Sequence, residues 1–360
     1  MGSTWRTAAL AAAAACLPLI VAQAQEPVSF KGKTITMIIG TTAGAGTDLT
    51  GRLFAKFFSK HLPGQPASVS QNIPAAHGIV AMNFLAQQAK TDGTTVSVAS
   101  SSQIDPATYR GTAAKYDPRE MAIIGSVGSG DTAMVIRADA LSRLYDKSKP
   151  PVTMGSVAGV PRTSMRMTVW GIEYLGWNAK WVVGYPGSSD LVLAMERGEI
   201  DMTAYPKVYL TDKLTDTAKF KVILSDTEDD SARPIGRADV DQSPSIHDAM
   251  KGKITDPLVA EAYDYWRSAV LIKWLALPPK TPVAIRDVYR AAFDKTIADP
   301  EFVAAAEQSM PGYTIVSAAA TERIIGKLAS TSKEALGVMD ELMRKQGLNV
   351  AKAQARGEGG

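Results

Sequence analysis

The segment Thr34-Ile35-Thr36-Met37-Ile38-Ile39-Gly40-Thr41-Thr42-Ala43-Gly44-Ala45-Gly46-Thr47-Asp48 decides the fold. Its first six residues form a short β-branched run, which predicts a strand, and the Gly/Thr-rich part that follows predicts a turn. Apolar residues then recur at helical spacing, at Leu49, Leu53, Phe54, Phe57 and Phe58. A strand, a polar turn and a helix in this order open a βαβ unit.

The same alternation continues along the chain. It predicts further strands at 67–71, 94–100, 152–157, 180–183 and 221–225, and helices at 79–89, 162–175 and 189–197. Such a pattern is typical of an α/β protein with mostly parallel sheets covered by helices. A late helical block follows, with helices expected at 259–268, 282–298, 301–309 and 319–345. We expect this block to pack onto the first domain and to make that domain discontinuous.

The N-terminal 24 residues predict a secretory signal peptide. One positive charge at Arg6 precedes an apolar stretch at 8–21, and Ala22-Gln23-Ala24 forms an A-x-A cleavage site. A stretch of about 14 apolar residues is shorter than the roughly 20 that a membrane-spanning helix needs. A lipoprotein anchored through Cys16 remains a second possibility. Because Cys16 is the only cysteine, a chain cut after Ala24 has no disulfide and no thiolate site.

The composition excludes some classes of partner. A net charge of +3 over 360 residues, without a basic run, gives a nucleic acid no electrostatic footprint. With 46% hydrophobic and 21% charged residues the chain is an ordinary globular protein, long enough for two domains.

The Gly/Thr-rich turn is suited to an anion, because a glycine-rich loop before a helix presents backbone N–H groups and the positive end of the helix dipole. It does not match a nucleotide motif. A dinucleotide fingerprint needs glycine where Leu49 stands, and a P-loop needs Lys and Ser/Thr where the chain has Arg52 and Leu53. A tight turn in which Thr47 or Asp48 caps the helix remains open, and it is compatible with anion binding.

No arrangement of residues predicts catalysis. His61, His77 and His247 lie far apart, and the chain has no H-E-x-x-H, C-x-x-C or G-x-S-x-G motif. Polar loops at strand ends without a nucleophile and base indicate recognition without chemistry. We therefore expect no enzyme, no catalytic metal and no cofactor.

Further motifs extend from the turn through most of the chain. In order they are Gln71-Asn72-Ile73-Pro74-Ala75-Ala76-His77-Gly78, Lys90-Thr91-Asp92-Gly93-Thr94, Asp105-Pro106-Ala107-Thr108-Tyr109, Tyr116-Asp117-Pro118-Arg119, Gly184-Tyr185-Pro186-Gly187-Ser188-Ser189-Asp190-Leu191, Arg197-Gly198-Glu199-Ile200-Asp201, Pro244-Ser245-Ile246, Trp274 with Pro278-Pro279-Lys280-Thr281-Pro282, and Asp299-Pro300-Glu301. Together they resemble the substrate-binding proteins of tripartite tricarboxylate transporters, the Bug receptor family.

The resemblance implies a periplasmic binding protein of two α/β domains, joined by two crossover segments, with the ligand cleft between them. It implies domain I at 28–126 and 223–350, domain II at 127–222 and a flexible tail at 351–360. Ligand-binding residues are expected in loops of both domains. The candidates are Thr41, Thr42, Gly44, Gly46, Thr47, Asp48, Ala76, His77, Ser100, Ser101, Arg162, Thr163, Ser164, Tyr185, Gly187, Ser188 and Asp201.

Departures from the family pattern concern the ligand. A basic position of the family is Pro186 here, and Arg162 could replace it as a clamp on a second carboxylate. His77 stands where a glycine is usual. Asp48 cannot hold an anion, so we expect it to cap the helix or to order water.

The function implied is that of a monomeric periplasmic receptor that closes on a small carboxylate and delivers it to integral membrane transporter subunits. Two alternatives remain. The same fold could serve a ligand-binding partner of a membrane sensor kinase, or an exported enzyme, although no nucleophile–base pair is apparent.

Overall fold

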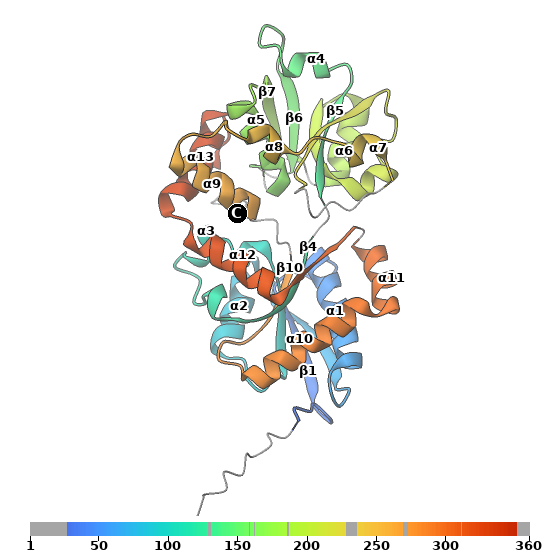
Figure 1. Cartoon of the computed structure of the whole chain (residues 1–360), viewed down its shortest axis with the longest axis vertical. Coiled ribbons are helices and arrows are strands. Elements are labelled where there is room, and N and C mark those ends of the chain that lie inside the picture. The colour runs from blue at the N-terminus through green and yellow to red at the C-terminus, as the bar shows by residue number, and fades with distance from the viewer. Residues whose placement is uncertain are drawn as a thin grey trace, which may run out of the picture.

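The computed structural model describes residues 27–128, 131–157, 159–161, 163–185, 187–227, 236–268, 273–310 and 312–350. The predicted signal peptide, Arg162, Pro186 and the 351–360 tail lie outside these ranges. The described chain forms two lobes along its longest axis, each built on one sheet (Figure 1). Within the described ranges, no helix has the length and apolar character needed to cross a membrane.

The first sheet, sheet A, has the order β11-β4-β10-β3-β1-β2. Strands β1 to β4 are parallel to one another, and β10 and β11 run antiparallel to them. The bounds are β1 (Thr34–Ile39), β2 (Ala67–Asn72), β3 (Thr95–Ser100), β4 (Ala122–Gly128), β10 (Lys273–Leu277) and β11 (Thr314–Ser317). Strand β10, from far along the chain, therefore lies between β3 and β4.

Helices cover both faces of sheet A, because its strands carry apolar side chains on both sides. One core cluster joins the sheet to α1 (Gly46–His61), α10 (Val283–Ala298) and α11 (Pro300–Ser309), and in it Phe54 stacks on Phe293 with ring centroids 5.5 Å apart. A separate cluster joins the sheet to α2 (Ile79–Gln87), the short α3 (Pro106–Tyr109) and α12 (Ala318–Ser330).

The second sheet, sheet B, has the order β7-β6-β8-β5-β9. Only β5 runs against the other four strands. The bounds are β5 (Thr132–Arg137), β6 (Val152–Val157), β7 (Ala179–Tyr185), β8 (Met202–Pro206) and β9 (Phe220–Ser225). The core on one face includes α5 (Met167–Tyr174), and the core on the other includes α6 (Ser188–Arg197) and the short α7 (Ala238–Asp241). Short α4 (Leu141–Leu144) lies after β5.

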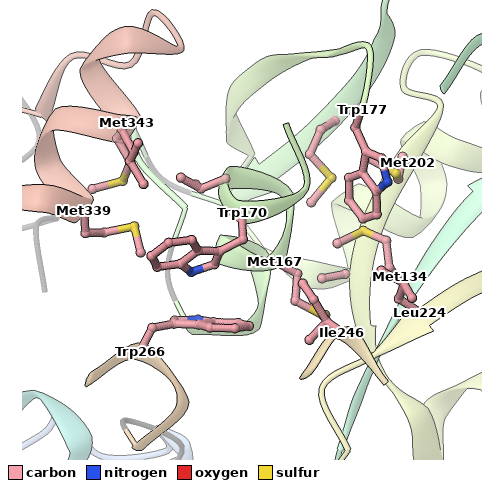
Figure 2. Close-up of a cluster of buried hydrophobic side chains, with 14 of the residues drawn as sticks. Met134, Met167, Trp170, Trp177, Met202, Leu224, Ile246, Trp266, Met339 and Met343 are labelled. Carbon is pink, nitrogen blue, oxygen red and sulfur yellow. The ribbon is translucent and has the colours of Figure 1, made fainter. Parts of the chain in front are cut away.

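The late helical block divides between the two lobes, which differs from the expectation that all of it packs onto the first domain. Helices α8 (Ile246–Met250), α9 (Pro257–Ser268) and α13 (Lys333–Lys345) place Ile246, Trp266 and Met339 in the core cluster of sheet B. In Figure 2, Trp266 and Met339 lie beside Trp170, and Ile246 lies beside Met167. Trp170 also meets Tyr263 edge-on with ring centroids 4.9 Å apart. The broad apolar faces of α9 and α13 are thus buried against α5.

The helix expected at 319–345 is two helices, and its break has a local cause. The Ser332 hydroxyl accepts the backbone N–H of Ala335 and so caps a new helix. Glu261 of α9 accepts both the N–H of Ser332, at 2.7 Å, and its hydroxyl, at 2.9 Å. The chain turns at this point, so that α12 packs on sheet A and α13 packs on α9 and α5.

The chain passes from one lobe to the other near Ser332, between α12 and α13, and also at two crossovers between the sheets, one from β4 to β5 and the other from α9 to β10. Both crossovers leave sheet A from the edge at which β1 to β4 end and β10 begins. On sheet B they leave from the edge at which β6 to β9 end and β5 begins. We call these the crossover edges. The boundary implied between 222 and 223 falls inside β9, which continues in sheet B to Ser225.

Candidate ligand-binding site

Both sheets carry the same winding at their centre. In sheet A, β2 and β3 lie on opposite sides of β1, so the strand order reverses at β1. In sheet B, β7 and β8 lie on opposite sides of β6 in the same way. In such sheets ligands bind beyond the carboxyl ends of the strands, at the point where the winding reverses. This rule points to the loops after β1 and β3 in one lobe and to those after β6 and β8 in the other.

Asp48 fixes the loop between β1 and α1. Its side chain is 1% exposed and accepts the Gly44 N–H at 2.8 Å and the Arg52 Nε–H at 3.0 Å. Asn72, at the end of β2, donates from Nδ2 to Asp48 and to the carbonyl of Thr41, both at 2.8 Å. Asp48 therefore organises the turn before the helix and does not cap the first helical N–H groups.

The pKa of Asp48 is lowered. Burial by itself raises the pKa of this carboxyl group, but the hydrogen bonds from Arg52, Asn72 and Gly44 outweigh it. The carboxylate is thus charged and fully engaged within the loop, as an anchor of the backbone around it.

Backbone N–H groups at the N-terminus of α1 lack acceptors within the described residues. Its N-cap, Ala45, makes no side-chain cap, and the N–H groups of Gly46, Thr47 and Asp48 have no acceptor within the described part of the chain. The hydroxyl of Thr41 is buried and also has no partner there. Buried polar groups are normally hydrogen-bonded, so the Thr41 hydroxyl fits an absent acceptor, and the N–H groups at the start of the helix are open to the same one.

Glycines hold three loops of sheet A together. A Cβ at Gly40 would lie 2.9 Å from the Cα of Gly78, and one at Gly78 would lie 2.9 Å from Nε2 of Gln103. Gln103 in turn accepts the Ser100 N–H at 2.7 Å. The expected segments around Thr41, Ala76 and Ser100 are thereby brought to one place at the crossover edge.

Lys273 is a cation at this edge that the sequence did not single out. It begins β10 and pairs with Ser100 of β3 and Val127 of β4. Its Nζ lies 3.8 Å from the position that a Cβ atom on Gly46 would take. Burial lowers the pKa of Lys273, and the ammonium has no ion pair or hydrogen bond within the described ranges.

The crossover edge of sheet B carries a polar cluster around Asp226. The carboxylate of Asp226 accepts the Thr132 N–H at 2.6 Å and the hydroxyl of Ser164. Nearby, Lys207 follows β8 and donates from Nζ to Thr227 at 2.5 Å. Ser164 is thus held at the edge by a residue that the sequence did not identify.

The carboxyl groups of this cluster are poorly solvated, and burial raises their pKa values. Burial raises the pKa of Asp226 to about 6, against the lowering effect of the bonds from Ser164 and the Thr132 N–H. Burial likewise raises the pKa of Asp131, with Thr227 and Lys207 acting in the opposite direction. The two acids raise each other's cost of ionisation, and Lys207 offsets part of it.

Arg166 is a second cation that the sequence missed. It ends the 3-10 turn at Thr163–Arg166, is 8% exposed, and donates from Nε to the Pro161 carbonyl at 3.3 Å. It has no ion pair within the described part of the chain. The nearby residue Arg162, expected as the clamp, lies outside the described ranges.

The remaining expected residues divide between the two ends of sheet B. Tyr185 and Gly187 stand at the crossover edge, after β7 and before α6, and burial raises the pKa of Tyr185. Asp201 lies at the opposite end of β8. There it accepts Arg143 Nη2–H at 2.7 Å and the Thr153 hydroxyl at 2.8 Å. These bonds make Asp201 a brace of sheet B, and we leave it out of the proposed site.

Backbone positions are described for three further candidates without their side chains. His77 lies in the 3-10 turn at Ala76–Gly78, Thr163 begins the turn that ends at Arg166, and Ser188 begins α6. Within the described residues, no three His, Cys, Asp or Glu side chains converge in a way that could hold a metal ion.

No protein-family model matches the chain. A UPF0065 protein in the gbd 5' region of Cupriavidus necator is 27% identical over 284 residues, covering 73% of this chain and 83% of that protein.

Solved structures share the fold over most of the chain. A TctC solute-binding protein from Polaromonas, solved without ligand, has a TM-score of 0.65 and 19% identity over 88% of this chain and 100% of its own. The periplasmic binding protein BugD has a TM-score of 0.52 and 18% identity, over 88% and 98%. The R. palustris protein Rpa4515, solved with adipate, has a TM-score of 0.54 and 16% identity, over 88% and 97%. The chain therefore has the two-sheet α/β fold of the TctC and BugD solute-binding proteins, which confirms the resemblance found in its sequence.

Proposed function

We propose that this protein is a periplasmic receptor that binds a small carboxylate between the crossover edges of its two sheets. The observation that carries this proposal is the N-terminus of α1, where three backbone N–H groups and the buried Thr41 hydroxyl lack an acceptor within the described residues. A carboxylate supplies two acceptor oxygens and a negative charge, and both are favoured at a helix N-terminus.

In the proposal, loops of sheet A and loops of sheet B contact different parts of the ligand. On sheet A, the Gly46 and Thr47 N–H groups and the Thr41 hydroxyl hold one carboxylate, while Asp48 and Asn72 keep the loop in shape. On sheet B, the loops that carry Ser164, Tyr185 and Gly187 meet the rest of the ligand. Thr42, Gly44, Ala76, His77, Ser101, Thr163 and Ser188 complete the proposed contact region.

Comparison with a related fold supports the ligand class. Rpa4515 was solved with adipate, a dicarboxylate, and its fold matches this chain with a TM-score of 0.54. The signal peptide predicted at 1–24 and the similarity of the fold to the periplasmic binding protein BugD support export to the periplasm. Delivery of the ligand to integral membrane transporter subunits, by a monomer that closes around it, completes the proposed role.

A thermal-shift screen tests the ligand class. A ligand that binds only the folded state raises the melting temperature, by an amount that grows with concentration relative to Kd. We expect at least one of adipate, hexanoate and benzoate to raise the melting temperature of the mature protein. Adipamide, the uncharged diamide, serves as the control. Stabilisation by none of the three carboxylates would contradict the proposal, whether or not adipamide stabilises the protein.

A further inference from the structure

Lys273 occupies a place that is electrostatically unfavourable in the empty protein. The N-terminus of a helix carries a partial positive charge and attracts anions, so a cation beside it is repelled. The Lys273 ammonium nevertheless lies at the start of α1, 3.8 Å from the Cβ position of Gly46. The side chain is also partly buried, and this burial lowers the pKa of Lys273.

The neighbouring residues supply no counter-charge. Lys273 is flanked in the sheet by Ser100 and Val127, and its ammonium has no ion pair or hydrogen bond within the described residues. A lysine with a purely structural role would be expected to pair with a carboxylate or to extend into water. Lys273 has no such pair among the described residues and is only partly exposed, so its ammonium is available to an anion placed beside the N-terminus of α1.

The strand register brings this charge to the donors already described. The last pair of β1 with β3 is Ile39 with Val98, and Thr41 and Ser100 each follow that pair by two residues in their own segment. Ser100 is the partner of Lys273. Strands β1 and β10 flank β3, so their backbones are about 10 Å apart. Both side chains can therefore reach one small group held in front of β3.

We propose that Lys273 is the specificity-determining residue that pairs with the carboxylate of the ligand at the N-terminus of α1. The proposal rests on the proposed function and deepens it, because it makes the negative charge of the ligand, and not only its hydrogen-bonding capacity, the quantity that is recognised. A carboxylate bridging the Gly46 N–H and Lys273 Nζ cancels the repulsion between the ammonium and the helix dipole. An amide of the same shape leaves it in place.

Calorimetric titration of the mature protein with adipate, hexanoate and adipamide tests this pairing. Lys273→Gln should weaken binding of the carboxylates at least about tenfold, the cost of losing one charge-assisted bond. Its effect on adipamide should be within twofold. Lys273→Arg should recover most of the affinity, because it keeps the charge. Lys280→Gln removes the same charge from the exposed region after the other end of β10, and should stay within twofold of the wild type.

A stability readout separates recognition from a structural role. Unliganded Lys273→Gln should melt at the same temperature as the wild type or higher, because it removes an unpaired, desolvated charge. A lower melting temperature would show that the fold needs the ammonium and would overturn the proposal.

A measurement on the unaltered protein provides an independent test. Acetic anhydride at limiting concentration should label Lys273 less in the presence of saturating adipate, while the labelling of Lys280 stays the same.

The outcomes distinguish the two proposals. If the wild type binds a carboxylate and Lys273→Gln binds it within twofold, or if adipate leaves the labelling of Lys273 unchanged, the pairing is overturned and the proposed function stands. If the wild type binds none of the carboxylates, both are overturned.

Discussion

The carboxylate of Asp48 accepts the backbone N–H of Gly44 at 2.8 Å, across the turn that leads from β1 into α1. This bond fixes the backbone just before Gly46, Thr47 and Asp48, whose N–H groups have no acceptor within the described residues. In the proposed function, the buried charge of Asp48 shapes this backbone and does not itself contact the ligand.

Replacing Asp48 by alanine should lower the free energy of unfolding by about 2–4 kcal/mol. The substitution leaves the Gly44 N–H without its acceptor, removes one of the two acceptors of the Asn72 amide, and breaks the ion pair of Arg52. Asp190→Ala, in the first turn of α6 and exposed, is the matched control and should change stability by no more than about 0.5 kcal/mol. Urea unfolding measures both, and an Asp48→Ala protein as stable as the control contradicts this account of the loop.

Gly40→Ala should separate the loops after β1 and β2. Its new Cβ would lie 2.9 Å from the Cα of Gly78, and backbone cannot rotate away as a side chain can. We expect a loss of about 1–3 kcal/mol in stability and weaker carboxylate binding. Gly326→Ala, in α12 with open space around it, should instead raise stability, by up to about 1 kcal/mol. Equal effects of the two changes would show that the approach of Gly40 to Gly78 is not a constraint.

The Asp226→Asn variant should be more stable than the wild type by an amount that grows as pH rises. The pKa of Asp226 is raised to about 6 in the folded protein. The stability that its protonated carboxyl group contributes is therefore fully present below about pH 4 and is lost as pH rises through 6. The difference in unfolding free energy between the variant and the wild type should therefore grow by about 2–3 kcal/mol between pH 4 and 7 and then level off.

The groups that face Asp226 are common to both proteins in this comparison. Ser164, the Thr132 N–H, Asp131 and Lys207 surround the carboxylate, and the ring of His247 contacts the Asp226 carbonyl. Subtracting the unfolding free energy of the wild type from that of the variant removes the contributions of groups that titrate in both proteins. A difference that is constant from pH 4 to 7 would mean that Asp226 is not held in the desolvated state described above.

Binding of a carboxylate should bring the two lobes closer together. The sheets are joined by two crossovers, and the proposed contacts lie on the edges from which these crossovers leave. Small-angle scattering should give a smaller radius of gyration with a saturating carboxylate than with adipamide at the same concentration. An unchanged radius in the presence of a bound carboxylate counts against closure.

The alternation of strands and helices could be predicted from the sequence because it depends on local patterns. Strands β1 and β6 occur at the expected residues, and the first turn of α1 follows the Gly/Thr-rich segment as expected. Strand β4 was not predicted, since Gly125 and Gly128 interrupt its apolar pattern. Strand β11 has only four residues, too few for a period to be recognised.

The parts of the site that could not be predicted depend on contacts between distant segments. Lys273 reaches the β1–α1 loop only because β10 inserts between β3 and β4, and no local pattern reports that pairing. Asp226 was missed because its burial comes from β5 and the Ser164 turn together. In the opposite direction, the motif around Asp201 was noticed, but its side chain braces the far end of sheet B.

A crystal structure of the mature protein with the tightest-binding carboxylate of the panel tests the central claim most directly. The account predicts one carboxylate oxygen within hydrogen-bonding distance of the Gly46 or Thr47 N–H group, with Lys273 Nζ contacting the same carboxylate. A ligand whose carboxylate lies away from the N-terminus of α1, with Lys273 still unpaired, would contradict it.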